Sequence, residues 1–151
     1  MTIDLDHSYL LKPGLWEMTG SYVDRNNNAW PQRGQLVITH QPDIWLIEAQ
    51  LIINTGETQT VNSRYDVQPL APGVAFTEWK SETGGPEPVL GLFVVVGDTL
   101  MSPWHSRSGA YWGQEILMRQ SPTEYQGRGF AFLNREKVSA WFTRLTRNGG
   151  Q

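Results

Sequence analysis

The stretch from Pro88 to Ser106, PVLGLFVVVGDTLMSPWHS, decides the fold class. Val89 to Val96 is an apolar run about as long as one buried strand, far short of the roughly 20 residues of a membrane-spanning helix, so we expect no membrane insertion. Thr99 to Ser106 is a second strand-like run, and only Gly97-Asp98 separates it from the first. Such a two-residue connection is typical of a tight hairpin with a primed turn. The stretch therefore predicts two neighbouring antiparallel strands.

The rest of the chain repeats this pattern of short β-rich runs between turn residues. The predicted strands are Gly14–Val23, Gly34–His40, Ile44–Ile53, Thr58–Val67, Val74–Ser81, Pro88–Val96, Thr99–Ser106, Ala110–Gln120, Tyr125–Leu133 and Val138–Arg147. Their connections are short, so neighbouring strands should pair antiparallel. A meander of this length normally closes, because closure removes its exposed edges. The sequence predicts an all-β fold, an antiparallel up-and-down barrel of about eight to ten strands.

The segment 135–147 fits either a closing strand or a helix. Its apolar residues also fall at helical spacing. These residues are Val138, Trp141, Phe142 and Leu145. The β-branched Thr143 and Thr146, and the need for a strand that closes the barrel, favour the strand.

The composition is that of one folded domain. The chain has 151 residues, of which 39% are hydrophobic and 18% are charged. Its 7 Trp, 5 Tyr and 5 Phe supply more apolar area than a disordered segment carries. We expect a single β-barrel domain over residues 1–151, with 1–13 as an N-terminal arm that closes the barrel and 148–151 as a frayed tail.

Composition and motifs exclude several classes of function. The chain has no cysteine, which excludes disulfides, thiolate metal sites and a cysteine nucleophile. Its three histidines form no short metal-binding pattern, so we expect neither a metal nor another cofactor. A net charge of -3 argues against binding of nucleic acid. Asp4 and Asp6 precede any apolar run, where a secretion signal would carry positive charge, so we expect a cytoplasmic protein.

Gly14-Leu15-Trp16 stands on the first predicted strand, and Arg144 and Arg147 stand on the last. This pair resembles the signature of the calycin superfamily, which includes lipocalins, fatty-acid-binding proteins and small bacterial relatives. The resemblance implies that Trp16 plugs one end of the barrel and that one of the two arginines packs across it; Arg144 is our candidate. The segment Asp24 to Arg33 is too short and polar for the helical lid of fatty-acid-binding proteins. The chain therefore resembles a minimal bacterial member.

Alternation along a closed barrel points every second side chain inward, where a barrel of this size can hold one small ligand. Aromatic side chains would line this space or simply fill it. Arginines among them would favour a planar or elongated apolar molecule with a carboxylate, because Arg pairs bidentately with that group. The candidate ligand-binding residues are Arg64, Trp79, Trp104, His105, Tyr111, Trp112, Glu115 and Arg119. Sequence alone does not fix which alternate set points inward.

Three functions follow from this interpretation. The leading hypothesis is a soluble binding protein that holds a small, mostly apolar ligand, such as a fatty-acid-like carboxylate or a tetrapyrrole-like molecule. The second is an enzyme on the same barrel, such as an isomerase, a cyclase or a chromophore lyase, with His105 or Glu115 as proton carrier, although no catalytic motif occurs. The third is a filled barrel that acts through its surface, for instance as a homodimer.

Overall fold

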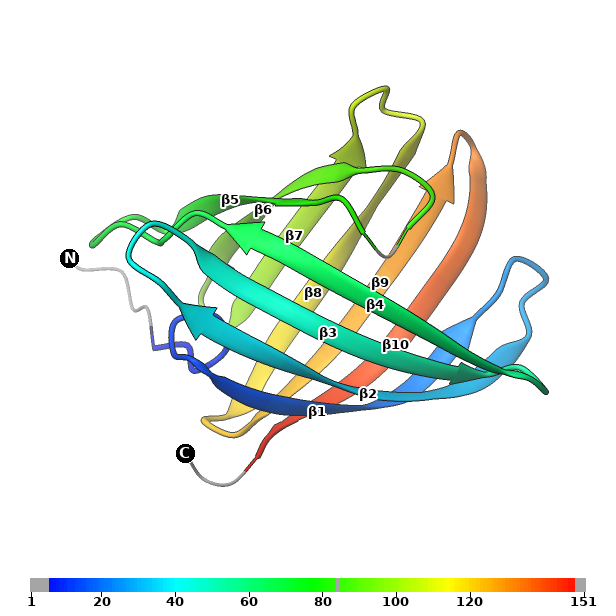
Figure 1. Ribbon diagram of the computed structural model, residues 1–151, viewed down its shortest axis with the longest axis horizontal. Helices are drawn as coiled ribbons and strands as arrows, with labels where there is room; N and C mark the ends of the chain where they lie inside the picture. The colour runs from blue at the N-terminus through cyan, green and yellow to red at the C-terminus, as the bar shows by residue number, and fades with distance from the viewer. Residues whose placement is uncertain (1–5, 84, 149–151) are drawn as a thin grey trace.

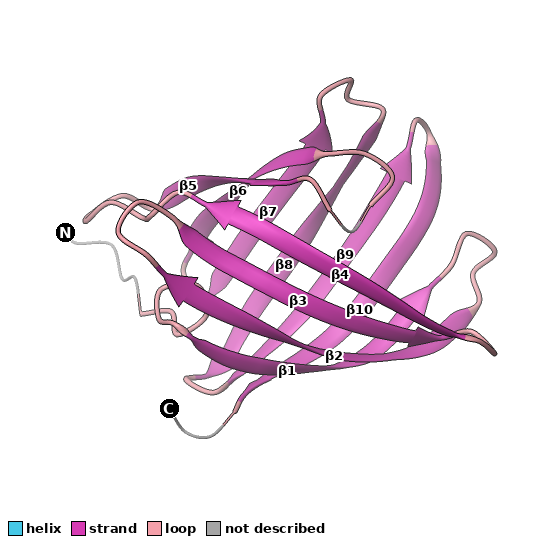
Figure 2. Ribbon diagram, viewed as in Figure 1, coloured by secondary structure: helices cyan, strands magenta, loops and turns pink. Residues whose placement is uncertain are grey.

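Ten strands form one closed antiparallel barrel in the computed structural model of the chain, which describes residues 6–83 and 85–148 (Figure 1). The strands are β1 (Gly14–Val23), β2 (Ala29–His40), β3 (Trp45–Asn54), β4 (Thr58–Val67), β5 (Phe76–Ser81), β6 (Val89–Val96), β7 (Thr99–Ser106), β8 (Tyr111–Ser121), β9 (Glu124–Leu133) and β10 (Glu136–Arg147). Each pairs with its neighbours in sequence, and β1 pairs with β10. The described residues contain no helix, and hence none that could cross a membrane (Figure 2). The predicted architecture is confirmed.

The segment that fitted a strand or a helix is a strand. Leu145 of β10 pairs with Met18 of β1 on one side and with Tyr125 of β9 on the other, so β10 is the closing strand. The apolar residues of β10 lie on both faces of the strand. Trp141 and Leu145 face inward, whereas Phe142 is exposed on the outer face. The helical spacing was therefore coincidental.

A single carboxylate shapes the turn between β1 and β2. Asp24 accepts hydrogen bonds from the backbone N–H groups of Asn26 and Asn28, each 2.9 Å long, and from Nε1 of Trp30 at 2.9 Å. Asn27 takes a φ of 64°, a left-handed conformation that asparagine tolerates better than most residues. The turn is therefore tight, and β2 begins at Ala29 rather than at the predicted Gly34.

The hairpin at Gly97-Asp98 forms as predicted, and Gly97 takes the positive φ, 60°, that a primed turn requires. A proline inside a strand is typical of a bulge or a sheet edge, and neither occurs at Pro103. Pro103 lies in the middle of β7, and the β7–β8 register runs unbroken through it. Pro103 has no N–H group and cannot donate a hydrogen bond to the neighbouring strand. Its effect is confined to β6, where the pairing with β7 is interrupted between Met101 and Trp104.

The pairing of β4 with β5 is the weakest in the barrel. Only Asp66 with Lys80 and Val67 with Trp79 are paired. Beyond this contact the two strands diverge, as Figure 2 shows. The backbone N–H of Arg64, further along the free edge of β4, donates instead to Oγ1 of Thr83, at 2.9 Å, in the β5–β6 connection.

One end of the barrel, here called the closed end, is filled with packed side chains. Its members include Tyr9, Trp16, Leu36, Ile38, Val67, Leu100, Leu117, Tyr125 and Leu145, all buried. Residues 6–13 run across this end and bury Tyr9 and Leu10, and Nε2 of His40 bonds to the carbonyl of Leu10 at 2.8 Å. Residues 1–5 of the predicted arm and 149–151 of the predicted tail lie outside the described residues, whereas the backbone N–H of Asn148 donates to the carbonyl of Leu15 at 2.9 Å.

Candidate functional site

The strand register fixes which side chains face the interior, because residues that pair across an antiparallel ladder share a face. One row across β5, β6, β7 and β8 reads Trp79, Gly91, Trp104, Gly113. A second row across β8, β9, β10 and β1 reads Glu115, Gly129, Trp141, Tyr22. Both rows face inward, and in each row a tryptophan lies beside a glycine of the neighbouring strand.

Each of three tryptophans lies over a glycine of the neighbouring strand. A Cβ atom at Gly91 would be 2.3 Å from the ring of Trp79, and one at Gly129 would be 2.2 Å from the ring of Trp141. A Cβ atom at Gly113 would likewise be 2.5 Å from Trp104. No side chain fits under these rings, so glycine is required for close approach. The three indoles therefore lie against the sheet and leave the middle of the barrel less obstructed.

This part of the interior, here called the open half, is lined by Trp79, Trp104, Tyr111, Glu115 and Trp141. Trp79 is 5% exposed, whereas Trp104, Tyr111, Glu115 and Trp141 keep accessible surface although they face inward, and all four are half-buried. At the closed end, by contrast, Trp16 and Leu100 are 0% exposed. Because the half-buried side chains of the open half face inward, their accessible surface lies on the inner side of the sheet or at the mouth of the barrel.

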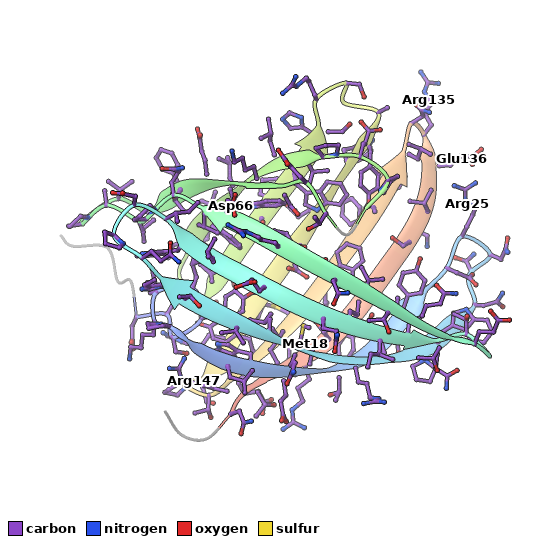
Figure 3. The ribbon with its side chains drawn as sticks, viewed as in Figure 1. Met18, Arg25, Asp66, Arg135, Glu136 and Arg147 are labelled. Carbon is purple, nitrogen blue, oxygen red and sulfur yellow. The ribbon has the colours of Figure 1, made fainter. Side chains whose placement is uncertain are left out.

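The two ends are also distinguished by their charged residues (Figure 3). Arg147 lies at the closed end, where its guanidinium is 5.9 Å from the ring centroid of Trp16 and donates to the carbonyl of Pro13 at 2.7 Å. Arg25 and Glu136 lie at the opposite mouth, with 3.9 Å between the guanidinium and the carboxylate. The open half is therefore the part of the interior between the packed plug and this mouth.

Glu115 is the charged group of the open half. Its Oε2 accepts a hydrogen bond of 2.8 Å from Nε1 of Trp141. Loss of water contact raises the pKa of this carboxyl above its ordinary value, and the bond from Trp141 opposes the rise only in part. Among the residues that the structure describes, no Lys or Arg lies within ion-pair distance of Glu115.

The negative charge of Glu115 contributes to the raised pKa of two tyrosines. Burial raises the pKa of the Tyr9 and Tyr65 hydroxyls, and the negative charge of Glu115 is the next largest cause for both. Tyr9 belongs to the closed end, whereas Tyr65 packs edge-on against Trp79 with ring centroids 5.1 Å apart. Glu115 therefore lies near the boundary between the packed plug and the open half, and both hydroxyls remain protonated.

Gln32 is one of several buried polar residues of the interior. It lies on β2 between Gly20 of β1 and Ile53 of β3 and is 5% exposed. Its side-chain Oε1 is buried and has no hydrogen-bond partner within the described residues. A buried acceptor without a partner costs free energy, on the order of 1–3 kcal/mol. Because Nε1 of Trp16 in the packed plug is also buried without a partner, the Gln32 orphan does not by itself mark a binding site.

Four of the eight predicted ligand-binding residues come together in the open half. Trp79, Trp104, Tyr111 and Glu115 face the interior, and the rings of Trp104 and Tyr111 lie 4.7 Å apart. The prediction was wrong for three others, which point outward. Arg64 is exposed and pairs with Asp66 at 3.0 Å.

His105 and Trp112 are the other two outward residues, and they pair with each other across β7 and β8. His105 bonds to the carbonyl of Ser106 at 2.8 Å, and Trp112 stacks on Phe132 with centroids 4.7 Å apart. Both alternate with inward neighbours, so neither can reach the interior. A proton carrier inside the barrel therefore cannot be His105.

The predicted arginines do not line the open half. Arg119 lies by register beside Tyr125 of the closed end and binds the carbonyl and carboxylate of Asp6 in the N-terminal segment. Arg144 was the wrong choice for the residue that packs across Trp16, because it lies on the outer face and pairs with Glu124 at 2.8 Å. Arg147, three positions along and on the inner face, pairs with Trp16 instead. Trp16 itself is buried at the closed end, where the resemblance placed it.

Several interior residues are absent from the set of predicted ligand-binding residues. These are Tyr22, Gln32, Tyr65 and Trp141. A usable indication was present for one of them, since Trp141 pairs with Gly129 of the Gly127-Arg128-Gly129 segment, and glycine inside a strand is typical of close packing or a bulge. The structure shows close packing at Gly129, and no bulge occurs there.

No known family description matches the chain, and no curated protein is similar to it. Two solved structures are similar in fold. EF1p2_mFAP2b bound to DFHBI shares 15% identity over 97% of this chain and 100% of that chain, with a TM-score of 0.54. The S-type phycobiliprotein lyase CPES from Guillardia theta shares 8% identity over 93% of this chain and 90% of that chain, with a TM-score of 0.50. These similarities support the closed barrel, and membership of the calycin superfamily stays a prediction.

Proposed function

We propose that the barrel binds a small, flat and mostly apolar molecule in its open half. The observation that carries this proposal is the arrangement of three indoles against facing glycines. In a barrel filled only by its own side chains, rings of this size would be expected to meet in the middle. Here Trp104 and Trp141, which are half-buried, line the wall beside the buried Trp79 and leave room for a planar guest to stack on them.

The fold comparisons support the proposal by example. The solved structure of EF1p2_mFAP2b holds a bound small molecule, DFHBI, which indicates that a barrel of this general form can accommodate such a guest. A sequence identity of 15% gives no information about which molecule this chain binds. The proposal therefore rests on the residues of the open half.

A cavity-filling substitution tests the proposal. Ser63 of β4 faces inward opposite Ala49 and is half-buried, so Ser63→Phe places a ring in the interior space. Asn62, its neighbour in the strand, is exposed on the outer face, so Asn62→Phe is a matched control. Binding of a planar tricyclic dye, followed by quenching of tryptophan fluorescence, should weaken at least tenfold in Ser63→Phe and stay unchanged in Asn62→Phe. Absence of binding to the wild type, or equal effects of both substitutions, would contradict the proposal.

A further inference from the structure

The chemistry around Glu115 bears on the kind of molecule that the open half accepts. We infer that the guest presents an N–H donor on a cationic or protonatable nitrogen to Glu115, and that a carboxylate-bearing guest is disfavoured. This inference rests on the proposed binding in the open half and narrows its ligand class. It reverses the expectation of a carboxylate, which depended on inward arginines.

The charge distribution inside the barrel is the first argument. Along the described strands, the inward charged residues are Glu115, Arg119, Glu136 and Arg147. The two arginines belong to the closed end, where Asp6 and the carbonyl of Pro13 are their partners. Glu136 lies at the mouth, exposed and facing Arg25. Glu115 therefore sets the sign of charge in the open half, and that sign is negative.

The hydrogen bonds of Glu115 are the second argument. An ionised carboxylate offers about four acceptor positions. Within the described residues, Nε1 of Trp141 is its one hydrogen-bond donor, at 2.8 Å. An enclosed carboxylate that has one neutral donor and no counter-ion costs free energy. A guest with an N–H group on a cationic nitrogen would provide a second hydrogen-bond donor and the missing positive charge. A guest carboxylate would instead bring a second negative charge beside the first.

The aromatic wall favours the same class of guest. Indole rings attract cations through the negative faces of their π-systems, and the attraction grows when water is excluded. Three tryptophans lie near this carboxylate. Trp141 donates to it, and Ser102, which pairs with Glu115 across β7 and β8, accepts from Nε1 of Trp79 at 2.9 Å. Trp104 lies two positions from Ser102 on the same face of β7. A carboxylate enclosed by indoles suits a flat cation, for which stacking and charge pairing act together.

Two three-ring dyes of opposite charge test the inference. Proflavine is a flat cation with N–H groups, and anthracene-2-carboxylate is a flat anion of similar size. We expect the wild type to bind proflavine at least tenfold more tightly than the carboxylate, measured by tryptophan quenching and dye polarisation at pH 7.5. Glu115→Gln should reduce this preference by about tenfold, because a charge-assisted bond becomes a neutral one.

Glu48→Gln is the control, because Glu48 is an exposed residue on the outer face of β3 and its substitution changes the net charge equally. Glu115→Gln keeps an oxygen to accept from Trp141, and an unchanged near-UV circular dichroism spectrum verifies its fold. A dye preference that Glu115→Gln leaves unchanged, or tighter binding of the carboxylate, overturns the inference while the proposed function stands. Binding of neither dye to the wild type overturns the proposed function and the inference with it.

Discussion

The closed end and the open half use the same ten strands in opposite ways. At the closed end, Trp16, Leu100 and Tyr125 are 0% exposed, and Nδ1 of His7 bonds to the Tyr125 hydroxyl at 2.6 Å, although Nε1 of Trp16 is buried and has no hydrogen-bond partner within the described residues. In the open half, Trp104 and Glu115 remain half-buried, and the carboxylate has no counter-ion within the described chain. The contrast teaches that strand geometry alone does not decide whether a barrel is filled.

The difference arises from the residues placed opposite the large aromatics. Trp16 is surrounded by Leu36, Tyr9 and Tyr125, whose side chains fill the space around it. Trp104 and Trp141 face Gly113 and Gly129 instead, so their rings rest on the backbone. We therefore expect the closed end to supply most of the stability and the open half to supply binding.

The largest expected effect comes from removing the plug. Trp16→Ala should destabilise the protein by about 3–5 kcal/mol, because a fully buried ring leaves a cavity that the surrounding side chains cannot close. Trp104→Ala, in the open half, should cost at least about 2 kcal/mol less, since its ring is already accessible, and should weaken dye binding. Denaturant unfolding of both variants measures the contrast. Equal losses of stability would remove the distinction between the two regions.

A substitution under a ring probes the open half directly. Gly129→Ala should cost about 1–3 kcal/mol, because the new methyl group displaces the Trp141 ring and with it the bond to Glu115. Adding Trp141→Leu should recover part of this loss, since the smaller side chain leaves room for the methyl group. A double-mutant cycle by denaturant unfolding tests the coupling, and additive losses would show that the ring does not rest on Gly129.

A smaller effect is expected from one polar contact of the closed end. Tyr125→Phe removes the hydroxyl that bonds to Nδ1 of His7 and leaves a buried ring nitrogen without a partner. The expected loss of stability is about 1–2 kcal/mol. Thr123→Val, an exposed substitution nearby, is the control and should change the stability little. Unchanged stability of Tyr125→Phe would contradict the contact.

The smallest expected effect is a gain in stability. Burial raises the pKa of Glu115 above 4.5 in the folded protein, so the folded state binds more protons than the unfolded state. The stability linked to this group is present at low pH and is lost as pH rises through the raised pKa. Glu115→Gln should therefore be more stable than the wild type at pH 8 and lose this advantage below pH 4.5. Thermal melts across this range test the sign, and an advantage that grows at low pH would contradict it.

The strands were predictable from sequence because each has its own period and its own turn residues. Asp24 with the asparagines after it, and Gly97-Asp98, mark turns whose geometry the structure reproduces. The start of β2 was predicted too late in the chain, because the sequence does not reveal that the Asp24 carboxylate alone holds the whole turn.

The faces of the strands were only partly predictable. Adjacent residues of a strand point to opposite sides, so Trp104 with His105, and Tyr111 with Trp112, could not both line one cavity. Which member faces inward depends on register, and register follows from pairs of residues far apart in sequence, such as Trp16 with Arg147. For the same reason, Arg144 was predicted to pack across Trp16 where the structure has Arg147, and Arg64 was predicted to face the interior where the structure has Tyr65.

The most direct test of the account uses the indole N–H resonances of the seven tryptophans. In a ¹H–¹⁵N spectrum with proflavine added, the signals of Trp79, Trp104 and Trp141 should shift, whereas those of Trp16 and the outward-facing Trp112 should stay in place. A shift confined to Trp112 would place the dye on the outer surface and contradict binding inside the barrel.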